Sequence, residues 1–399
     1  MLFDFRLSCG EVIVSRLSKL QITNFRNLLN VDIELSAGIT VLYGNNGEGK
    51  TSLLEAIYYL SVGRSFKAEN EREVVNQKVA LAGGQCVIHG EAVRSGRGYQ
   101  IILLAQAYPR QDTGSVSKSY LIKKQIRINQ TPKTASDLFG TISAVIFHVE
   151  DIRLIEGSPS GRRRFLDILI SQCDKEYLNS LRRYQKVLQQ RNKLLKAIRD
   201  KRAEKSELVY WDQLLIDDSY SISKARQMAV KEMEELLGRQ YTWLDGREKQ
   251  ININLVSINA LSKDRAEFTD WMQSELRSKF HVEIKTGTSL LGPHRDDFNI
   301  LVDGFDIGRY GSRGEKKILA LALRMSEASF ISNRREDDPI ILLDDVLSEL
   351  DEYKRACVLN MASSYGQSLI TTTDSNLISS VSGISAKYAE VTQGKVYTE

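Results

Sequence analysis

The chain has 399 residues, of which 42% are hydrophobic and 27% charged, and only five are proline. This composition is typical of a globular protein and excludes collagen-like and low-complexity chains. The net charge of +4 is too small to indicate nucleic-acid binding by itself, so local clusters of charge must decide that question. No apolar run reaches the roughly 18–20 residues that cross a bilayer, and the acidic start does not fit a signal peptide. We therefore expect a cytoplasmic protein.

Four cysteines lie far apart and form no C-x-x-C pair, which favours reduced thiols over a disulfide framework. The four histidines show no spacing typical of metal ligands, so the sequence argues against a zinc site. They are His89, His148, His281 and His294.

The first 151 residues combine short strands with one helix. Alternating patterns predict two half-buried strands, and two almost wholly apolar segments predict buried ones. These strands are expected at residues 17–25, 30–35, 38–44 and 144–151. The apolar spacing of residues 51–63 predicts a helix that ends at glycine. Pieces rich in β-formers between 85 and 129 predict a small antiparallel sheet.

From residue 162 to 237 the chain lacks proline and has the spacing of long amphipathic helices, with a polar break near 201–206. Apolar residues three and four apart mark one face of the first helix, and Arg191 interrupts them. They are Leu181, Tyr184, Leu188, Leu195 and Ile198. Strands are then expected at residues 251–258 and 281–287, within 338–351, and at 368–374.

The segment GNNGEGKT matches the phosphate-loop pattern G-x-x-x-x-G-K-[ST] in full, between a predicted strand and a predicted helix. Its residues are Gly44, Asn45, Asn46, Gly47, Glu48, Gly49, Lys50 and Thr51. Backbone N–H groups would wrap the phosphates, Lys50 would contact the β and γ phosphates, and the Thr51 hydroxyl would hold Mg²⁺. The alternative is an accidental glycine turn, but the flanking strand and helix favour the phosphate loop.

The segment IILLDD, residues 340–345, supplies a partner for this loop. Four apolar residues bring Asp344 to the carboxyl end of a predicted central strand, where a Walker B aspartate meets Mg²⁺. Asp345 follows, placed to orient or deprotonate an attacking water. A core strand that ends in an acidic turn would look similar. Because the chain also carries a phosphate loop, we favour the nucleotide interpretation, with ATP and Mg²⁺ as cofactors.

Six motifs occur along the chain in the order ITNFRN, GNNGEGKTSLLEAIYYLSVGRSF, GRRRFLD, LLGPHRDD, GSRGEKK and IILLDDVLSELD. Together they resemble the RecF family of bacterial recombination mediators, which is related to SMC proteins. Walker motifs alone would indicate only an ATPase, whereas GRSF, RRRFLD and LLGPHRDD single out this family. The resemblance runs from about residue 14 onward, and the first 13 residues have no counterpart in it.

The segment GSRGEKK, residues 311–317, opens a predicted helix and offers a second set of anion-binding groups. In ATP-binding-cassette ATPases, to which the chain is similar, the signature lies here and closes on the γ-phosphate held by the other protomer. The resemblance therefore implies that Ser312 and Gly314 contact the ATP of the partner in an ATP-gated homodimer. It also implies that Arg26 and Asn46 help to hold nucleotide.

The resemblance further implies an ATP-dependent DNA-binding protein of recombinational repair and replication restart. Such a protein acts at single-strand gaps and single-strand/duplex junctions, works with RecR and RecO to load RecA, and supports SOS induction. Asp351 would lie in the D-loop between the two nucleotide sites of the dimer.

Some features depart from the wider ATPase class. The usual catalytic glutamate is Asp345, which is shorter by one methylene, and the switch histidine is replaced within TTTD, where Thr373 is the nearest candidate. No glutamine can be assigned to the Q-loop. We therefore expect slow, DNA-stimulated hydrolysis, with ATP acting as a clamp rather than as fuel.

Between residues 181 and 205 there are ten lysines and arginines and only two acids. This imbalance, in a chain that is only mildly basic overall, favours contact with DNA phosphates over a merely solvated face. The candidate DNA-binding residues are Arg182, Arg183, Lys186, Lys193 and Lys196, followed by Arg199 and Lys201. Residues 162–164 are a second candidate, or form structural ion pairs. No sequence-reading motif is present, so binding should be independent of sequence.

The His–Arg–Asp–Asp cluster in LLGPHRDD, residues 290–297, could suggest a nuclease metal site. The family resemblance instead places this motif near the junction of two lobes and assigns it no chemistry. We therefore favour a structural role.

The sequence thus predicts an α/β fold, an ABC/SMC-type P-loop ATPase head with an inserted helical arm domain. We expect residues 1–165 and 286–399 to form the head and residues 166–285 the arm, which is too short for a long SMC coiled coil. Two alternatives remain at this point. One is a transport-type ATPase subunit, and the other is a structural-maintenance or anti-phage ATPase of the same superclass that does not load RecA.

Overall fold

The computed structural model describes residues 13–68, 70–109, 120–256, 264–379, 381 and 383–398. Contacts divide the chain into two compact units. The first, here called the head unit, consists of residues 1–151 and 327–399, and the second, the arm unit, of residues 152–326. A head built from both ends of the chain around an inserted arm agrees with the predicted fold class.

The contact division differs from the expected boundaries at 165/166 and 285/286. The arm unit extends beyond residues 166–285 because segments that precede and follow them in the sequence pack with the long helices. These segments form short helices and part of a small sheet. The start of the helix α10 (Arg313–Arg335) also groups with the arm unit, whereas its end belongs to the head unit.

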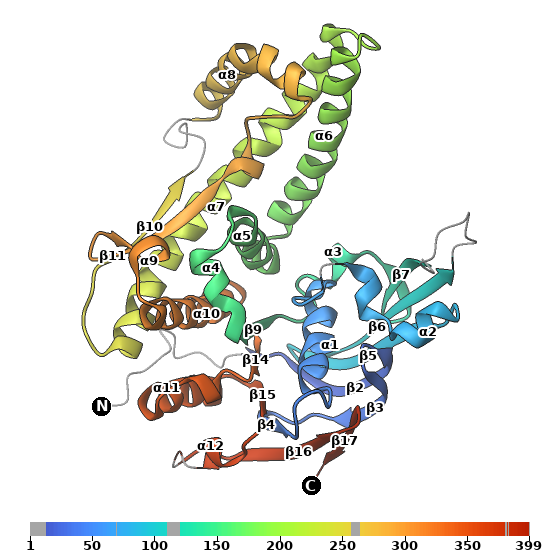
Figure 1. Ribbon diagram of the computed structural model, residues 1–399, viewed down its shortest axis with the longest axis vertical. Coiled ribbons are helices and arrows are strands. Elements are labelled where there is room, and N and C mark those ends of the chain that lie inside the picture. The colour runs from blue at the N-terminus through green and yellow to red at the C-terminus, as the bar shows by residue number, and fades with distance from the viewer. Residues whose placement is uncertain are drawn as a thin grey trace. The chain divides into compact units, whose positions relative to one another are not determined.

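The head unit contains a six-stranded sheet in the order β17-β16-β4-β15-β14-β9, in which every pair but β17 with β16 is parallel (Figure 1). All residues of β14 and β15 are buried, as expected for strands covered on both faces. The strands are β4 (Gly38–Tyr43), β9 (Ala144–His148), β14 (Ile340–Asp344), β15 (Gln367–Thr372), β16 (Ala386–Thr392) and β17 (Lys395–Thr398).

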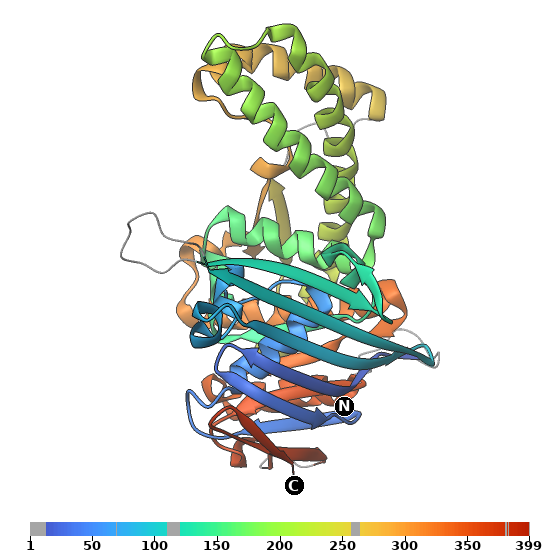
Figure 2. The same ribbon diagram turned by 90° about the vertical axis from the view of Figure 1, so that its right-hand side faces the viewer.

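A second sheet of the head unit is antiparallel, in the order β3-β2-β5-β6-β7-β8, and its long strands cross Figure 2. Buried residues alternate along β5, so one face of this sheet meets the core. The sheet expected between residues 85 and 129 is confirmed. Its strands are β2 (Arg16–Phe25), β3 (Leu28–Glu34), β5 (Gln85–Arg94), β6 (Arg97–Pro109), β7 (Tyr120–Ile128) and β8 (Thr131–Lys133).

The helix α1 (Lys50–Val62) contacts strands of both sheets and is buried at every residue from Leu53 to Val62. Gly63 ends the helix in the left-handed conformation, and its N–H donates to the carbonyl oxygen of Tyr59. The remaining short elements of the head unit are β1 (Ile13–Val14), η1 (Glu71–Val74), α2 (Gln77–Leu81), α3 (Ala135–Leu138), η2 (Val149–Asp151), β13 (Asp337–Asp338), η5 (Leu347–Glu349), α11 (Glu352–Ser364) and α12 (Asn376–Ser379).

The arm unit is organised around two long antiparallel helices, α6 (Lys175–Arg199) and α7 (Leu208–Asp245), which run side by side (Figure 1). The polar break expected near 201–206 is the turn between them. The helix α8 (Arg265–Thr286) packs against both. The other elements are α4 (Ile152–Glu156), α5 (Pro159–Cys173), η3 (Lys205–Glu207), β10 (Ile251–Val256), η4 (Pro293–Arg295), β11 (Asp297–Val302), β12 (Phe305–Asp306) and α9 (Ile307–Tyr310).

One expected strand is wrong. Residues 281–287 form the last turns of α8 and its glycine cap. Only two apolar residues alternate here, which is too few to tell the period of a strand from that of a helix. Tertiary contacts favour the helix, because Glu283 is buried and Ile284 packs on a cluster that includes Leu195. The expected strand at 251–258 is confirmed up to Val256, and its last two residues lie outside the described part of the chain.

No helix among the described residues is both long and apolar enough to span a membrane.

Candidate nucleotide-binding site

The predicted phosphate loop lies between β4 and α1, as the sequence pattern requires. Gly44 has φ +145°, and a Cβ built there would stand 2.3 Å from the carbonyl oxygen of Val391, so no side chain fits. Gly49 has φ +112° and caps α1, where a Cβ would stand 2.6 Å from Leu28. The loop therefore runs close to its neighbours and leads straight into the N-terminus of α1, whose first N–H groups suit an anion.

Neighbouring segments brace the loop from outside. Asn27 donates a hydrogen bond from its side-chain amide to the carbonyl oxygen of Gly47 over 2.8 Å. The backbone N–H of Gly394 donates to the carbonyl oxygen of Glu48 over 3.0 Å, and the N–H of Gln393 donates to the Glu48 carboxylate. Asn45 and Asn46 are exposed. The hydrogen bonds from Asn27, Gln393 and Gly394 therefore hold the loop in place.

The Lys50 ammonium is turned onto its own loop, where it donates to the carbonyl oxygens of Gly44 (2.6 Å) and Asn45 (2.8 Å). The residue is only 7% exposed. Burial lowers the pKa of Lys50, while the charges of Asp345, Asp344 and Glu48 act in the opposite direction. A cation held in this position faces the loop that would receive the phosphates.

The carboxylate of Asp344, 3% exposed, lies at the end of β14 and accepts three hydrogen bonds. Its Oδ1 accepts from the hydroxyls of Thr51 (2.8 Å) and Thr371 (3.0 Å), and its Oδ2 lies 3.3 Å from Nε2 of His148. Burial by itself would raise the pKa of Asp344, but hydrogen bonds from His148, Thr51 and Thr371 together lower it. The predicted Walker B aspartate therefore contacts the threonine of the predicted phosphate loop.

Asp345 follows with φ +53°, and its backbone N–H donates to the Thr371 hydroxyl over 3.0 Å. Burial and the charge of Asp344 raise the pKa of Asp345, although a hydrogen bond with Ser348 opposes this change. A raised pKa makes a carboxylate a stronger base. Within TTTD, Thr371 contacts both the Asp344 carboxylate and the backbone of Asp345, and Thr373 stays the predicted replacement for the switch histidine.

His148 at this site was missed by sequence reasoning. It ends β9, the strand paired in parallel with β14, and Asp344 pairs with His148 in the register of the two strands. The sequence does carry a signal for His148, because β9 is an apolar strand that ends in a polar residue, the same pattern that predicted Asp344. Strand order, which the sequence does not show, was needed to bring the two ends together.

Arg26, expected to hold nucleotide, forms a bidentate ion pair with Glu55 of α1, with N–O distances of 2.9 and 2.8 Å. Glu55 is 1% exposed and also accepts a hydrogen bond from the hydroxyl of Ser65. The ITNFRN and GRSF motifs therefore meet at one buried carboxylate beside the phosphate loop.

The signature residues Ser312 and Gly314 belong to the arm unit. The Ser312 hydroxyl accepts a hydrogen bond from the N–H of Glu315 (3.3 Å), and the Ser312 N–H donates to the Glu315 carboxylate (2.9 Å). This reciprocal cap starts α10 and leaves the serine hydroxyl proton free to donate. Asp351 caps α11 by accepting from the N–H of Lys354 over 2.9 Å.

A family model described as RecF/RecN/SMC N terminal domain matches residues 16–395. The DNA replication and repair protein RecF of Chloroflexus aurantiacus is 36% identical over 361 residues, which cover 88% of this chain and 91% of the relative. RecF of Chloroflexus aggregans is also 36% identical, over 95% of this chain and 98% of its own. The chain belongs to the RecF family.

Solved structures agree with the RecF fold. The recombination mediator protein RecF with ATP, of the RecFOR pathway, has a TM-score of 0.86 and 27% identity, covering 98% of this chain and 100% of that one. The Smc head domain of Pyrococcus furiosus, bound to the C-terminal domain of ScpA, has a TM-score of 0.52 at 16% identity, with 97% and 96% covered, and shares the fold alone. The wider SMC relationship of the RecF family is therefore visible in the fold.

The RecF-like motifs GRRRFLD and LLGPHRDD bind each other within the arm unit. Buried Arg226 donates to Asp296, Asp167 and the carbonyl oxygen of Pro293, each over 2.7 Å. Arg162 forms a bidentate pair with Asp297, with N–O distances of 2.7 and 2.9 Å. The described residues contain no group of three or more His, Cys, Asp or Glu side chains that could hold a metal ion. The motifs hold the fold of the arm unit.

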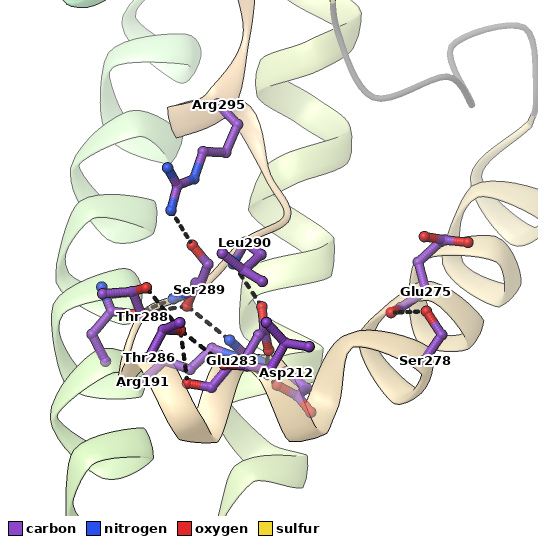
Figure 3. Close-up of polar contacts among 12 residues, drawn as sticks. Arg191, Asp212, Glu275, Ser278, Glu283, Thr286, Thr288, Ser289, Leu290 and Arg295 are labelled. Carbon is purple, nitrogen blue, oxygen red and sulfur yellow. Dashed lines mark hydrogen bonds and ion pairs between the residues drawn. The ribbon is translucent and has the colours of Figure 1, made fainter.

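Arg191, which interrupts the apolar spacing of α6, is the centre of a second polar network (Figure 3). It is 1% exposed and donates over 2.7 Å to each of Asp212 on α7, Glu283 on α8 and Ser289. Glu283 also accepts from the N–H of Leu290 over 2.7 Å. The interruption in the pattern is therefore a buried cation that ties three helices together.

The predicted DNA-binding cations of α6 fall into two groups. Arg183 pairs with Asp218 of α7 over 2.8 Å. Lys186, Lys193 and Lys196 are exposed and have no carboxylate within 4 Å in the part of the chain that the structure describes. Together with exposed Arg182 they follow one face of the helix, because they are spaced by four, seven and three residues. We call these four residues the basic stripe.

Proposed function

We propose that this member of the RecF family binds ATP with Mg²⁺ in the head unit and that nucleotide binding controls its contact with DNA. The observation that carries the proposal is the 2.8 Å hydrogen bond from the Thr51 hydroxyl to Asp344, directly after Lys50 of the phosphate loop. It joins the two motifs that a nucleotide and its metal need together. The solved RecF structure with ATP supports the same assignment.

The donor atoms at this site fit Mg²⁺. The Thr51 hydroxyl and the Asp344 carboxylate are hard oxygen ligands, which this ion prefers, and it keeps several waters when it binds beside phosphates. Bound there, Mg²⁺ would neutralise charge on the β and γ phosphates. Thr51 and Asp344 would hold the ion, directly or through its waters, and Lys50 would leave the carbonyl oxygens of its loop to meet the phosphates.

Hydrolysis, in this proposal, is slow. Asp345 stands next to Asp344 with a raised pKa, which suits a residue that accepts a proton from water. Its side chain is one methylene shorter than the glutamate of related ATPases, so it reaches less far toward the γ-phosphate. A long-lived ATP state suits a clamp that is closed by the nucleotide and opened by hydrolysis.

Dimer formation would complete each nucleotide site. Ser312 and Gly314 open α10 on the surface, and the Ser312 hydroxyl keeps its proton after capping the helix. That proton, with the N–H groups of the first turn, would bind the γ-phosphate held by a second copy of the chain. The expected product is an ATP-dependent homodimer.

DNA would bind the basic stripe through its phosphates. From Arg182 to Lys196 the stripe extends roughly 21 Å along α6 at the helical rise of 1.5 Å per residue. Flexible lysines contact phosphates as point charges and read no bases, so binding would be independent of sequence. Gapped and single-strand/duplex DNA are the substrates that the family suggests.

Family membership supports a role in the cytoplasm with RecR and RecO, helping to load RecA at gaps and supporting SOS induction. An SMC-like ATPase that does not serve RecA loading remains the competing candidate. A pull-down with RecR, with and without ATP, separates the two, because only the mediator should retain RecR when ATP is present.

The nucleotide assignment is tested by Lys50→Ala. Loss of the ammonium should weaken ATP binding by about 2–3 kcal/mol, the scale of a hydrogen bond to a charged group. Isothermal titration calorimetry with Mg²⁺ and ATP measures this change. Lys78→Ala, which removes an exposed lysine from α2 of the same unit, is the matched control and should bind like the parent. Equal affinity in Lys50→Ala and parent would refute the phosphate loop.

A further inference from the structure

The Walker B carboxylate has almost no acceptor capacity left. An ionised carboxylate offers about four lone-pair positions, two on each oxygen. The Thr51 and Thr371 hydroxyls lie against Oδ1 of Asp344, and the Thr371 hydroxyl is shared with the carbonyl oxygen of Leu343 at 3.3 Å. His148 occupies one position on Oδ2. Within the described part of the chain, one position, on Oδ2, has no donor against it and remains for a ligand.

The His148 ring is fixed on three sides. Its Nδ1 accepts a hydrogen bond from the N–H of Glu150 over 3.1 Å, so the proton of the imidazole lies on Nε2, the atom that faces Asp344. Its backbone N–H donates to the Asp151 carboxylate over 2.8 Å. The ring of Phe66 lies 5.7 Å away, centre to centre, and itself packs edge-on against Tyr58. The Nε2 proton therefore has a defined direction.

We propose that His148 is a positioning residue for the metal of this site. By donating to Oδ2 of Asp344 it leaves one acceptor direction on the carboxylate, which receives the Mg²⁺ shell of the bound nucleotide. The inference rests on the proposed function, because it requires that Mg²⁺ accompany ATP at this site. His148 acts through Asp344 and touches neither phosphate nor reacting water in this role.

The imidazole also serves the fold, because Asp344 is only 3% exposed and Oδ2 needs a donor. The two threonine hydroxyls lie against Oδ1, so His148 is the residue that sets the acceptor direction left on Oδ2. Without His148, Oδ2 would offer two acceptor positions, and the carboxylate could present either to the ion. Partners of this kind orient metal ligands, and their loss typically lowers metal affinity by roughly 10–100-fold.

The test compares the parent with His148→Ala and His148→Gln. ATP affinity of the full-length protein is measured by calorimetry twice, with excess Mg²⁺ and with EDTA, and the ratio of the two affinities is the Mg²⁺-dependent gain. We expect His148→Ala to reduce this gain by about 10-fold and to leave the affinity in EDTA unchanged. His148→Gln carries an amide N–H at similar reach and should recover most of the gain.

His89→Ala is the matched control, because His89 lies in the antiparallel sheet of the same unit and binds Gln21 instead of Asp344. It should keep the full gain. An undiminished gain in His148→Ala would overturn the inference while leaving nucleotide binding intact. An equal loss with Mg²⁺ and with EDTA would reduce His148 to a structural role. A parent protein that binds ATP equally well under both conditions would overturn the magnesium part of the proposed function itself.

Discussion

Two buried carboxylates of the arm unit and Asp344 of the head unit are satisfied differently, although the head unit also contains an arginine-paired buried carboxylate, Glu55. In the arm unit Glu283 and Asp296 face guanidinium groups of Arg191 and Arg226 over 2.7 Å. In the head unit Asp344 faces two hydroxyls and an imidazole, and among the described residues no lysine or arginine lies within ion-pair distance of it. Hydrogen bonds from His148, Thr51 and Thr371, together with an electrostatic contribution from His148, keep the pKa of Asp344 low against the effect of burial.

The difference separates a structural cluster from a site. In the arm unit an arginine lies against each of these buried carboxylates and supplies a positive charge inside the fold. Asp344 stays ionised and keeps one acceptor position, which a metal ion can use. Buried carboxylates are therefore better sorted by whether an arginine pairs with them than by how deeply they are buried.

Removing Arg191 should have the largest effect. Arg191→Met leaves Asp212 and Glu283 without their cation, and stranding a buried charge costs about 3–5 kcal/mol. Urea unfolding of the full chain, followed by circular dichroism, measures the loss. Arg265→Met is the control, because both side chains of its pair with Asp217 are exposed, by 63% and 39%, and this pair should contribute under about 1 kcal/mol. Similar losses for the two variants would contradict a special role of the buried network.

The pH dependence of stability tests the packing of the arm unit through the partly buried His294. Burial lowers the pKa of His294 to about 4. Because the unfolded histidine titrates near 6.5, the unfolded chain binds more protons between these values, so stability should fall as pH drops from about 6.5 to 4. The loss attributable to this group is roughly 2–3 kcal/mol.

Urea midpoints at several pH values, compared between parent and His294→Gln, isolate this contribution. The variant should show a shallower decline. His281→Gln, which changes an exposed histidine of α8, should follow the parent. A steeper decline in His294→Gln would reverse the assigned direction.

The basic stripe extends the same contrast to cations, since Arg183 has a carboxylate partner and the stripe lysines have none among the residues that the structure describes. Lys186→Ala with Lys193→Ala should weaken DNA binding by about 1–2 kcal/mol and lower the slope of log K against log salt by about 1.4–1.8, as two fewer phosphates are neutralised. Fluorescence anisotropy with gapped DNA at several salt concentrations gives both values. The double variant Lys231→Ala with Lys285→Ala has the same net charge and should retain the slope of the parent. Equal slopes of log K against log salt for the two double variants would mean that DNA binds elsewhere on the protein.

The smallest expected change in stability comes from Asp344→Asn. The amide oxygen can still accept from Thr51 and Thr371, so the cost should be about 1 kcal/mol, the scale of one hydrogen bond. Asp296→Asn, equally buried but opposite Arg226, should cost about 2–3 kcal/mol. Urea unfolding of the two variants side by side measures the difference. A larger cost at Asp344 would show that this carboxylate, too, serves mainly the fold.

The sequence by itself determined the phosphate loop, the Walker B strand and the membership of the family. These features depend on neighbouring residues: glycines that permit the backbone of the loop, and an apolar run that ends in two acids. The long helices of the arm were also predictable, because their spacing persists over many turns.

Only the tertiary structure decided which distant side chains meet. His148 reaches Asp344 because β9 and β14 are parallel neighbours, and Arg191 is a buried hub because α7 and α8 bring acids to it. The same packing turned residues 281–287 into helix and took Arg183 out of the set of unpaired cations. Short-range patterns set the backbone that each segment prefers, whereas charge pairing depends on chain segments far apart in sequence, whose order in space no local pattern encodes.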